Sequence, residues 1–318
     1  MSRGRAWLRS FCGHSACSRA AAVVQFGISI PNFGPYFDVR RLAALAHDAE
    51  EAGWDGFFLW DHVYWALFPI SDPWMALTAI ALRTTRVRIG TMVTPLPRRR
   101  PVKLARETVT LDHVSGGRLI LGVGLGVRPQ EWEQLGEEAD LVVRGRMLDE
   151  GLQVLERLWR GEAAEHHGEH FTVQVRDLPG HEGAVPFAPP ARQQPRIPVW
   201  VGGRWPNKPP FRRGACWDGI IPTSVRGGIH ERLTAEQLSE CVEYTMHHRA
   251  VDQPLEVAIG GHTDGNDLAR DQAHLAAYQQ AGATWWLEDL SPWAFGWQWE
   301  GDWPIARMEE RVRHGPTR

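Results

Sequence analysis

The residues best suited to chemistry in this sequence are Asp61 and His62. They end an almost wholly apolar run in "GFFLWDHVYW" (residues 56–65), after which aromatic residues resume. An imidazole can give or take a proton near neutral pH, so His62 is a candidate general acid or base. The alternative is that the two side chains merely satisfy loop backbone, or each other. From these residues alone the two interpretations are equally good, and the choice depends on the fold to which this strand belongs.

A second pattern is "WVGGRWPNK" (residues 200–208), in which a strand ends in Gly202 and Gly203. Glycines let backbone N–H groups approach a ligand closely, and Pro206 suggests that a helix starts just after them. A helix N-terminus favours anions, and Arg204 and Lys208 add positive charge. The pattern predicts a phosphate site, although a plain turn with solvated basic residues has the same sequence.

Two further segments combine strand character with unusual residues. "LGVGLG" (residues 121–126) alternates glycine with apolar residues, which indicates close approach either by a flat ligand ring or by neighbouring backbone. "TMVTPLPRRRP" (residues 91–101) ends a strand with threonine and proline, and we expect a bend or bulge there.

Composition excludes several classes of protein. The chain has 318 residues, 43% of them hydrophobic, and a formal charge of −3. This balance predicts neither nucleic acid nor membrane as a partner. The four cysteines form no metal-like pair, so we expect reduced thiols, no metal site and a cytoplasmic location. Residues 1–22 lack acids and carry four arginines; we expect a disordered extension, with a targeting segment as the alternative, before one domain over 23–318.

Eight short apolar runs alternate with helical patterns over the rest of the chain. We predict strands at 23–30, 55–61, 86–93, 118–126, 197–203, 218–224, 255–261 and 284–290. This alternation predicts an α/β fold, a (β/α)8 (TIM) barrel; a doubly wound sheet is the competitor, but no GxGxxG opens its first turn. An irregular insert over 166–196, before the fifth strand, is interpreted as a loop near the barrel mouth.

In such a barrel the carboxyl ends of the strands carry the site. His62 and the glycine segments all fall at these ends. Their position favours the functional interpretation of each over the structural one. Tryptophan is abundant, with 16 residues. We place Trp60, Trp65 and Trp286 in an aromatic substrate pocket, although each could equally be core.

Several segments together resemble the bacterial luciferase-like family of flavin- and deazaflavin-dependent oxidoreductases. They are "FGISIPNFGPY", "AEEAGWDGFFLWDH", "RIGTMVTPLPRRRPVKLARETVTLDHVSGGRLILGVGLG", "LDEGLQVLERLWRGE", "HHGEHFTV", "PRIPVWVGG" and "AGATWWLE". The resemblance spans about residues 24–290. It implies a luciferase-like barrel, FMN or coenzyme F420 at its mouth, monooxygenation or hydride transfer on a small organic substrate, and a homodimer. If the chain is an oxygen-using member of the family, a separate flavin reductase would supply its reduced cofactor.

The resemblance also assigns roles to single residues. It implies that His62 is catalytic and that a non-proline cis peptide joins Thr91 to Met92 beside the cofactor ring. The remaining cofactor-binding residues that we assign are Asp61, Gly124, Leu125, Gly126, Gly202, Gly203 and Arg204. Two alternatives stay open: a catalytically silent flavin-binding barrel, and a glycoside hydrolase using Asp61 and Glu288.

Overall fold

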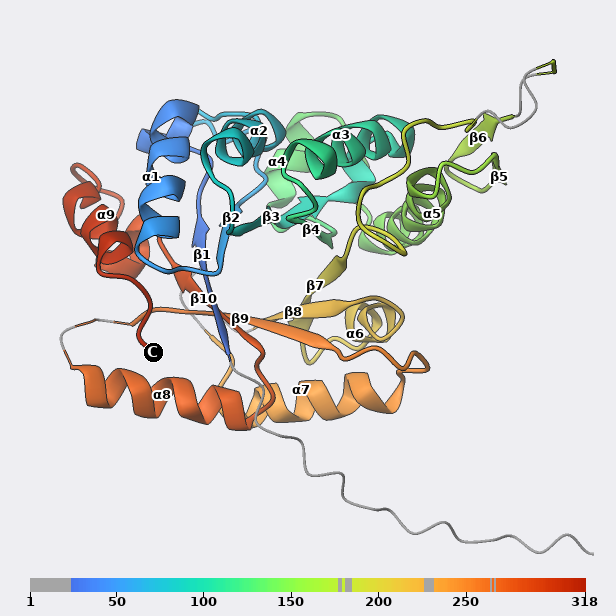
Figure 1. Ribbon diagram of the computed structural model, residues 1–318. Helices are drawn as coiled ribbons and strands as arrows, with labels where there is room; N and C mark the ends of the chain where they lie inside the picture. The colour runs from blue at the N-terminus through green and yellow to red at the C-terminus, as the bar shows by residue number, and fades with distance from the viewer. Residues whose placement is uncertain (1–23, 177–178, 181–184, 226–231, 264, 266) are drawn as a thin grey trace, which may run out of the picture.

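Eight parallel strands close into a barrel in the order β1-β10-β9-β8-β7-β4-β3-β2, and β2 pairs with β1 (Figure 1). This computed structural model describes residues 24–176, 179–180, 185–225, 232–263, 265 and 267–318. The barrel strands are β1 (Gln25–Ile30), β2 (Gly56–Leu59), β3 (Arg88–Pro95), β4 (Leu119–Gly124), β7 (Val199–Trp205), β8 (Gly219–Ser224), β9 (Glu256–Gly261) and β10 (Trp285–Asp289). All eight predicted strands are confirmed, and the doubly wound alternative is wrong because the sheet is closed.

Helices cover the outside of this barrel (Figure 1). They are α1 (Val39–Glu51), α2 (Pro73–Arg83), α3 (Pro101–Val114), α4 (Pro129–Gln134), α5 (Leu141–Trp159), α6 (Pro209–Gly214), α7 (Ala235–His247), α8 (Leu268–Gln280) and α9 (Ile305–Arg313). Asp38 and Asp72 cap the first two helices, since their side chains accept backbone N–H groups at the starts of α1 and α2. Within the described residues, no helix is both long enough and apolar enough to cross a membrane. The predicted extension over 1–22 lies outside the described residues.

Aromatic side chains fill the barrel interior. The rings of Phe58, Trp200 and Trp285 lie 5.4–5.8 Å apart, centroid to centroid. Trp286 follows Trp285 directly, so it points to the opposite face of β10. Its ring lies 5.4 Å from His274 and 5.6 Å from Tyr278, both on α8. The prediction that Trp286 lines a substrate pocket is therefore wrong, since this side chain is 2% exposed between the barrel wall and a helix.

The insert before β7 is more ordered than predicted and lies at the other end of the barrel. It contains an antiparallel hairpin, β5 (Ala164–His167) with β6 (Thr172–Val175). Farther along, Gln193 donates hydrogen bonds to Asp112 and to the carbonyl of Leu119, where β4 begins. A connection from a helix into the next strand must start at the amino ends of the strands. The insert therefore cannot be a loop near the mouth, where we had placed it.

A buried ion pair fastens the last helix to the barrel. Glu288 in β10 is 0% exposed and accepts hydrogen bonds from both the backbone and the hydroxyl of Thr263. Arg311 in α9 lies 3.4 Å from the same carboxylate and donates 2.7 Å to the Thr263 hydroxyl. Burial alone would raise the pKa of Glu288, but His262, Arg311 and the Thr263 N–H outweigh it and lower the pKa. Glu288 is thus a structural residue rather than a glycosidase carboxylate.

Candidate active site at the barrel mouth

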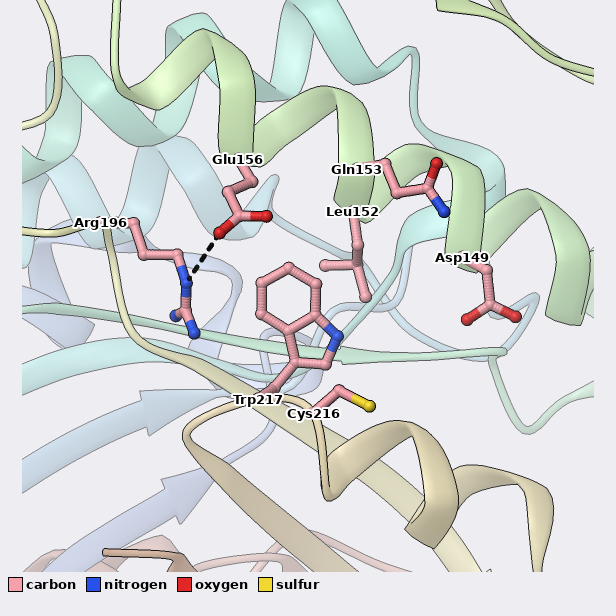
Figure 2. A pocket seen from close by; sticks show the side chains of 7 residues that line it. All are labelled: Asp149, Leu152, Gln153, Glu156, Arg196, Cys216 and Trp217. Atoms are coloured by element: carbon pink, nitrogen blue, oxygen red, sulfur yellow. Dashed lines mark ion pairs between the residues drawn. The ribbon is translucent and has the colours of Figure 1, made fainter. Parts of the chain in front are cut away.

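The barrel mouth, meaning the carboxyl ends of the eight strands with the loops that follow them, gathers most of the predicted site residues. Two cavities lie elsewhere. One of 340 Å³ is on the outer flank between α5 and the turn before β8, where Trp217 lies beside the Arg196–Glu156 ion pair (Figure 2). The other, of 680 Å³, is at the amino ends of β1 and β9. No predicted site residue lines either cavity.

His62 stands in the loop after β2, and Asn32 after β1 fixes its backbone. The Asn32 amide nitrogen donates to the carbonyls of His62 and Ser71, at 2.8 and 2.7 Å. The Asn32 amide oxygen accepts the His62 N–H at 3.3 Å. With Asn32 buried, these bonds leave the loop little freedom. The His62 side chain is 11% exposed, with ring contacts to Phe33, Trp60 and Trp65.

Glu131 in α4 orients the His62 ring, and sequence reasoning missed it. Its Oε2 lies 3.2 Å from His62 Nδ1. Its Oε1 accepts the backbone N–H groups of Val63 and Tyr64, at 2.8 and 3.1 Å, and pairs with Arg98 at 3.1 Å. The available signal was an acid in the first turn of a helix just after the glycine-rich end of β4. Only the fold shows that this turn reaches the loop after β2.

The charge of Glu131 decides which nitrogen of His62 carries the proton. Burial alone would raise the pKa of Glu131, but the hydrogen bond and charge of His62, the Val63 N–H and the charge of Arg98 lower it to about 2. An ionised carboxylate can only accept hydrogen bonds, so Nδ1 is the protonated nitrogen. Nε2 is then the atom that can take or give a proton, and no described residue hydrogen-bonds it.

Asp61 does not face a ligand, contrary to its predicted cofactor-binding role. Its side chain is 0% exposed, and its two oxygens accept 2.7 Å hydrogen bonds from Thr94 and Arg99. Burial raises the pKa of this carboxyl, and the charge of Arg99 and the Thr94 hydroxyl oppose that effect. Asp61 therefore ties the loop after β2 to the end of β3. This supports the structural alternative for this residue.

β3 bulges at the predicted place, but the cis bond is one residue later. It joins Met92 to Val93, not Thr91 to Met92, and the register with β4 shifts between Thr91 and Thr94. The Thr91 side chain is buried in the barrel wall, where its hydroxyl donates to the Gly122 carbonyl. Met92 and Val93 are half-buried and pack on the ring cluster inside the barrel, so they form the floor of the mouth.

Gly124, at the end of β4, and Gly126, just after it, leave room for neighbouring side chains near the bulge. A Cβ at Gly124 would lie 2.7 Å from Val93, and one at Gly126 would lie 2.7 Å from Trp132. Gly126 also has a φ of +80°, which favours glycine. The Leu125 carbonyl accepts a 2.8 Å hydrogen bond from Arg144. Tight packing thus accounts for the glycine at both positions, while their direct contact with a cofactor remains a prediction.

The predicted phosphate site after β7 is not built as expected. A Cβ at Gly203 would lie 2.4 Å from Pro210, so this glycine admits α6 rather than a ligand. The helix starts with Pro209 and Pro210, which have no N–H to offer an anion. Lys208 turns away to lie 3.5 Å from the Trp205 ring centroid. Gly202 and the exposed Arg204 are left as candidate contacts from this segment.

A planar cofactor ring fits the mouth because the inward positions there are small. They include Ser29, Gly202 and Gly260, above the bulge at Met92 and Val93. The described residues leave space over β9, where a Cβ at Gly260 would meet only Arg232 Nη1, at 3.8 Å. Trp60 donates 3.0 Å to the Ser29 hydroxyl and forms one wall. Trp60 also contacts the His62 ring, with 6.2 Å between centroids, and so links the imidazole to the β1 side of the mouth.

The fold and this arrangement at the mouth agree with the sequence comparisons. The luciferase-like monooxygenase family matches residues 19–212, and the chain belongs to that family.

Two relatives show the range of this family. The chain is 27% identical over 238 residues to the oxygenase component of the flavin-dependent trigonelline monooxygenase of Acinetobacter baylyi, covering 74% of this chain and 62% of that protein. It is 32% identical over 233 residues to the F420-dependent glucose-6-phosphate dehydrogenase of Gordonia bronchialis, covering 70% and 65%. The chain thus spans somewhat less than two thirds of the length of these relatives.

Solved structures share the fold at lower identity. A monooxygenase from Streptomyces bottropensis has a TM-score of 0.67 at 20% identity, covering 91% of this chain and 97% of that one. The coenzyme F420-dependent tetrahydromethanopterin reductase of Methanopyrus kandleri also scores 0.67, at 16% identity, covering 92% and 97%. These likenesses support the luciferase-like barrel.

Replacing Glu131 with glutamine is expected to lower kcat without changing cofactor affinity. If the glutamine oxygen accepts the Val63 N–H, its NH2 group faces His62 Nδ1 and can only donate, so the Nδ1 proton loses its acceptor. We expect a smaller loss than the roughly 100- to 10,000-fold that complete loss of general acid–base catalysis costs. Steady-state kinetics measure kcat and KM, and cofactor titration measures Kd. A change in KM alone would contradict a positioning role.

Acidification should remove the contribution of Glu131 to stability. The folded pKa of about 2 lies below the ordinary value of 4.5, so the stabilisation is complete above pH 4.5 and is lost as the pH falls toward 2. A shift of this size corresponds to about 3 kcal/mol. Urea unfolding of the wild type and E131Q at pH 6 and pH 3 should show a smaller difference at pH 3. Equal differences at both pH values would argue against this coupling.

Proposed function

We propose that this chain is an oxidoreductase that binds FMN or coenzyme F420 at the barrel mouth and acts on a small organic substrate. The observation that carries the proposal is the His62–Glu131 pair, 3.2 Å apart, at the end of the barrel where Gly260 also lies. The names of the two relatives support it, because one is flavin-dependent and the other F420-dependent. When bound, the cofactor supplies the electron chemistry that side chains lack.

The residues of this chain supply position and proton transfer. His62 Nε2 takes a proton from the substrate or returns one, while Glu131 holds Nδ1–H and stabilises the imidazolium. Trp60 walls the substrate side and limits water, while the buried Trp65 supports this wall from within. Gly124, Leu125, Gly126, Gly202 and Arg204 are the proposed neighbours of the cofactor, with Thr91, Gly203 and Asp61 supporting them from within the wall.

The proposal extends to partners and location. As an oxygen-using enzyme, the chain would receive reduced flavin from a separate reductase, which the name "oxygenase component" of the Acinetobacter relative supports. We also propose a cytoplasmic homodimer. The glycoside hydrolase gains no support, since Asp61 and Glu288 are both occupied by structural partners. The silent binding barrel gains none either, because the two relatives are named as enzymes.

An absorbance spectrum of the purified chain after incubation with FMN or coenzyme F420 tests the proposal. A bound flavin absorbs in the blue and a deazaflavin at shorter wavelength. Consumption of the reduced cofactor with and without oxygen then separates monooxygenase from dehydrogenase. Purification from a deazaflavin-producing host identifies what co-purifies. Failure to bind either cofactor would refute the proposal.

A further inference from the structure

We propose that the substrate of this site is a carboxylate on a flat, apolar body, and that Arg128 binds the carboxylate. This inference rests on the proposed function and names its substrate class. Arg128 lies in the loop after β4, three residues before Glu131. Its guanidinium carbon lies 3.7 Å from the ring centroid of Trp65, whose own ring is 5.5 Å from His62. The Arg128 cation is therefore separated from the His62 ring by a single side chain, that of Trp65.

Arg128 is unpartnered, unlike the neighbouring arginines. Its Nε is buried and lacks a hydrogen-bond partner, and no described residue accepts from its terminal nitrogens. By contrast, Arg99 is paired with Asp61, Arg98 with Glu137, and Arg232 with Asp289. Burial lowers the pKa of Arg128, and the charge of Glu131 opposes this effect.

Glu131 cannot serve as the missing acceptor for Arg128. Its oxygens already accept from His62, Val63 and Tyr64 and pair with Arg98. A half-buried guanidinium with free N–H groups in a fork suits the two oxygens of a carboxylate. The Trp65 ring behind it holds the fork in one plane. Arg128 therefore offers a carboxylate-binding group on the ring of Trp65, which in turn contacts the His62 ring.

The walls beside Arg128 are flat and apolar. Trp65 stacks on Trp293 with centroids 5.9 Å apart and planes at 16°, and Trp293 is nearly parallel to Trp60 at 3°. Trp299, in the loop after β10, lies 6.1 Å from Trp65. Trp65 and Trp293 are themselves buried, at 6% and 5% exposure, so they support the wall from behind. Trp299 is the indole of this group that is open to a planar ring.

Trp299 adds an independent observation. Among the described residues it is the one non-glycine residue with a left-handed backbone, at φ 71°, and its side chain is 49% exposed. A bulky residue in this region costs about 1 kcal/mol or more. One side of the indole packs on Trp293 and Trp297, with centroids 4.9 and 5.4 Å away, and the rest of it is exposed. We therefore assign Trp299 to the outer face of the substrate subsite, where a bound ring would cover it.

Calorimetric binding of matched acids and amides to the full chain tests the inference. The probes are benzoate, 2-naphthoate and indole-3-acetate, each compared with its neutral amide, with and without FMN or coenzyme F420. At least one acid should bind more tightly than its amide. R128Q should weaken acid binding by roughly 10- to 100-fold, the value of a charged hydrogen bond, and leave amide binding unchanged. W299A should weaken both members of a pair.

Arg83→Gln is the matched control, because Arg83 is exposed at the end of α2 and loses the same charge. It should bind every probe as the wild type does. Equal affinity for acids and amides, wild-type acid binding by R128Q, or no binding of any acid would overturn the inference. So would a loss of cofactor affinity in R128Q, since Arg128 would then hold the cofactor's anionic tail. Cofactor binding is titrated in a separate experiment. A wild-type chain that binds no cofactor would refute the proposed function, whatever the acids and amides do.

Discussion

Replacing His62 with alanine is expected to lower kcat by roughly 100- to 10,000-fold while cofactor affinity stays unchanged. The reason is the orientation of the ring: Glu131 holds Nδ1, so Nε2 is the atom left for proton transfer. Steady-state kinetics and cofactor titration on the same preparation measure the two quantities.

Two further variants separate chemistry from packing at this position. His62→Asn keeps a side-chain N–H that can donate to Glu131 but has no titratable nitrogen, so it should be as slow as the alanine variant. His47→Ala, on α1, removes a half-buried histidine outside the mouth and should keep full activity. Recovery of turnover in His62→Asn would show that His62 acts only as a structural hydrogen-bond donor.

Replacing Gly260 with leucine is expected to weaken cofactor binding by about 100-fold or more, which corresponds to about 3 kcal/mol. The new side chain would occupy the space over β9, where, of the residues that the structure describes, only Arg232 comes near a Cβ, with its Nη1 at 3.8 Å. The fold should tolerate the change for the same reason. Titration with FMN and with coenzyme F420 measures the loss, and thermal unfolding reports stability.

Gly145→Leu is the control for this variant. Gly145 lies in α5, and a Cβ there meets only Arg213, at 3.7 Å. It should bind cofactor as the wild type does. If Gly260→Leu also bound cofactor normally, the ring would have to lie away from β9, and the proposed seat of the cofactor would be wrong.

The barrel was predictable because each strand is a short, self-contained apolar run between helical patterns. The face of the sheet to which each side chain points was not predictable. Strands covered on both faces lack the polar–apolar alternation that reveals a face, so Trp285 and Trp286 look alike in sequence. Closure of the sheet puts Trp285 inside, against Phe58, and Trp286 outside, against α8.

The site was predicted in part for a similar reason. His62 is recognisable from its place at a strand end, but its partner Glu131 is 69 residues away and meets it only through the fold. Two errors had signals in the sequence. The insert joins a helix to a strand, which fixes the end of the barrel where it lies. Pro209 and Pro210 show that the helix after β7 begins without free N–H groups.

The pairing of Glu288 with Arg311 makes α9 part of the barrel itself. A chain cut short before Ile305 would remove the Arg311 charge from beside a carboxylate sealed in the wall. Loss of one partner of a buried ion pair typically costs about 3–5 kcal/mol. Glu288 belongs to β10, which pairs with β1 and so closes the barrel. The loss of Arg311 would therefore destabilise the place where the first and last strands meet. Fusions and trimmed versions of this protein should therefore leave its final helix intact.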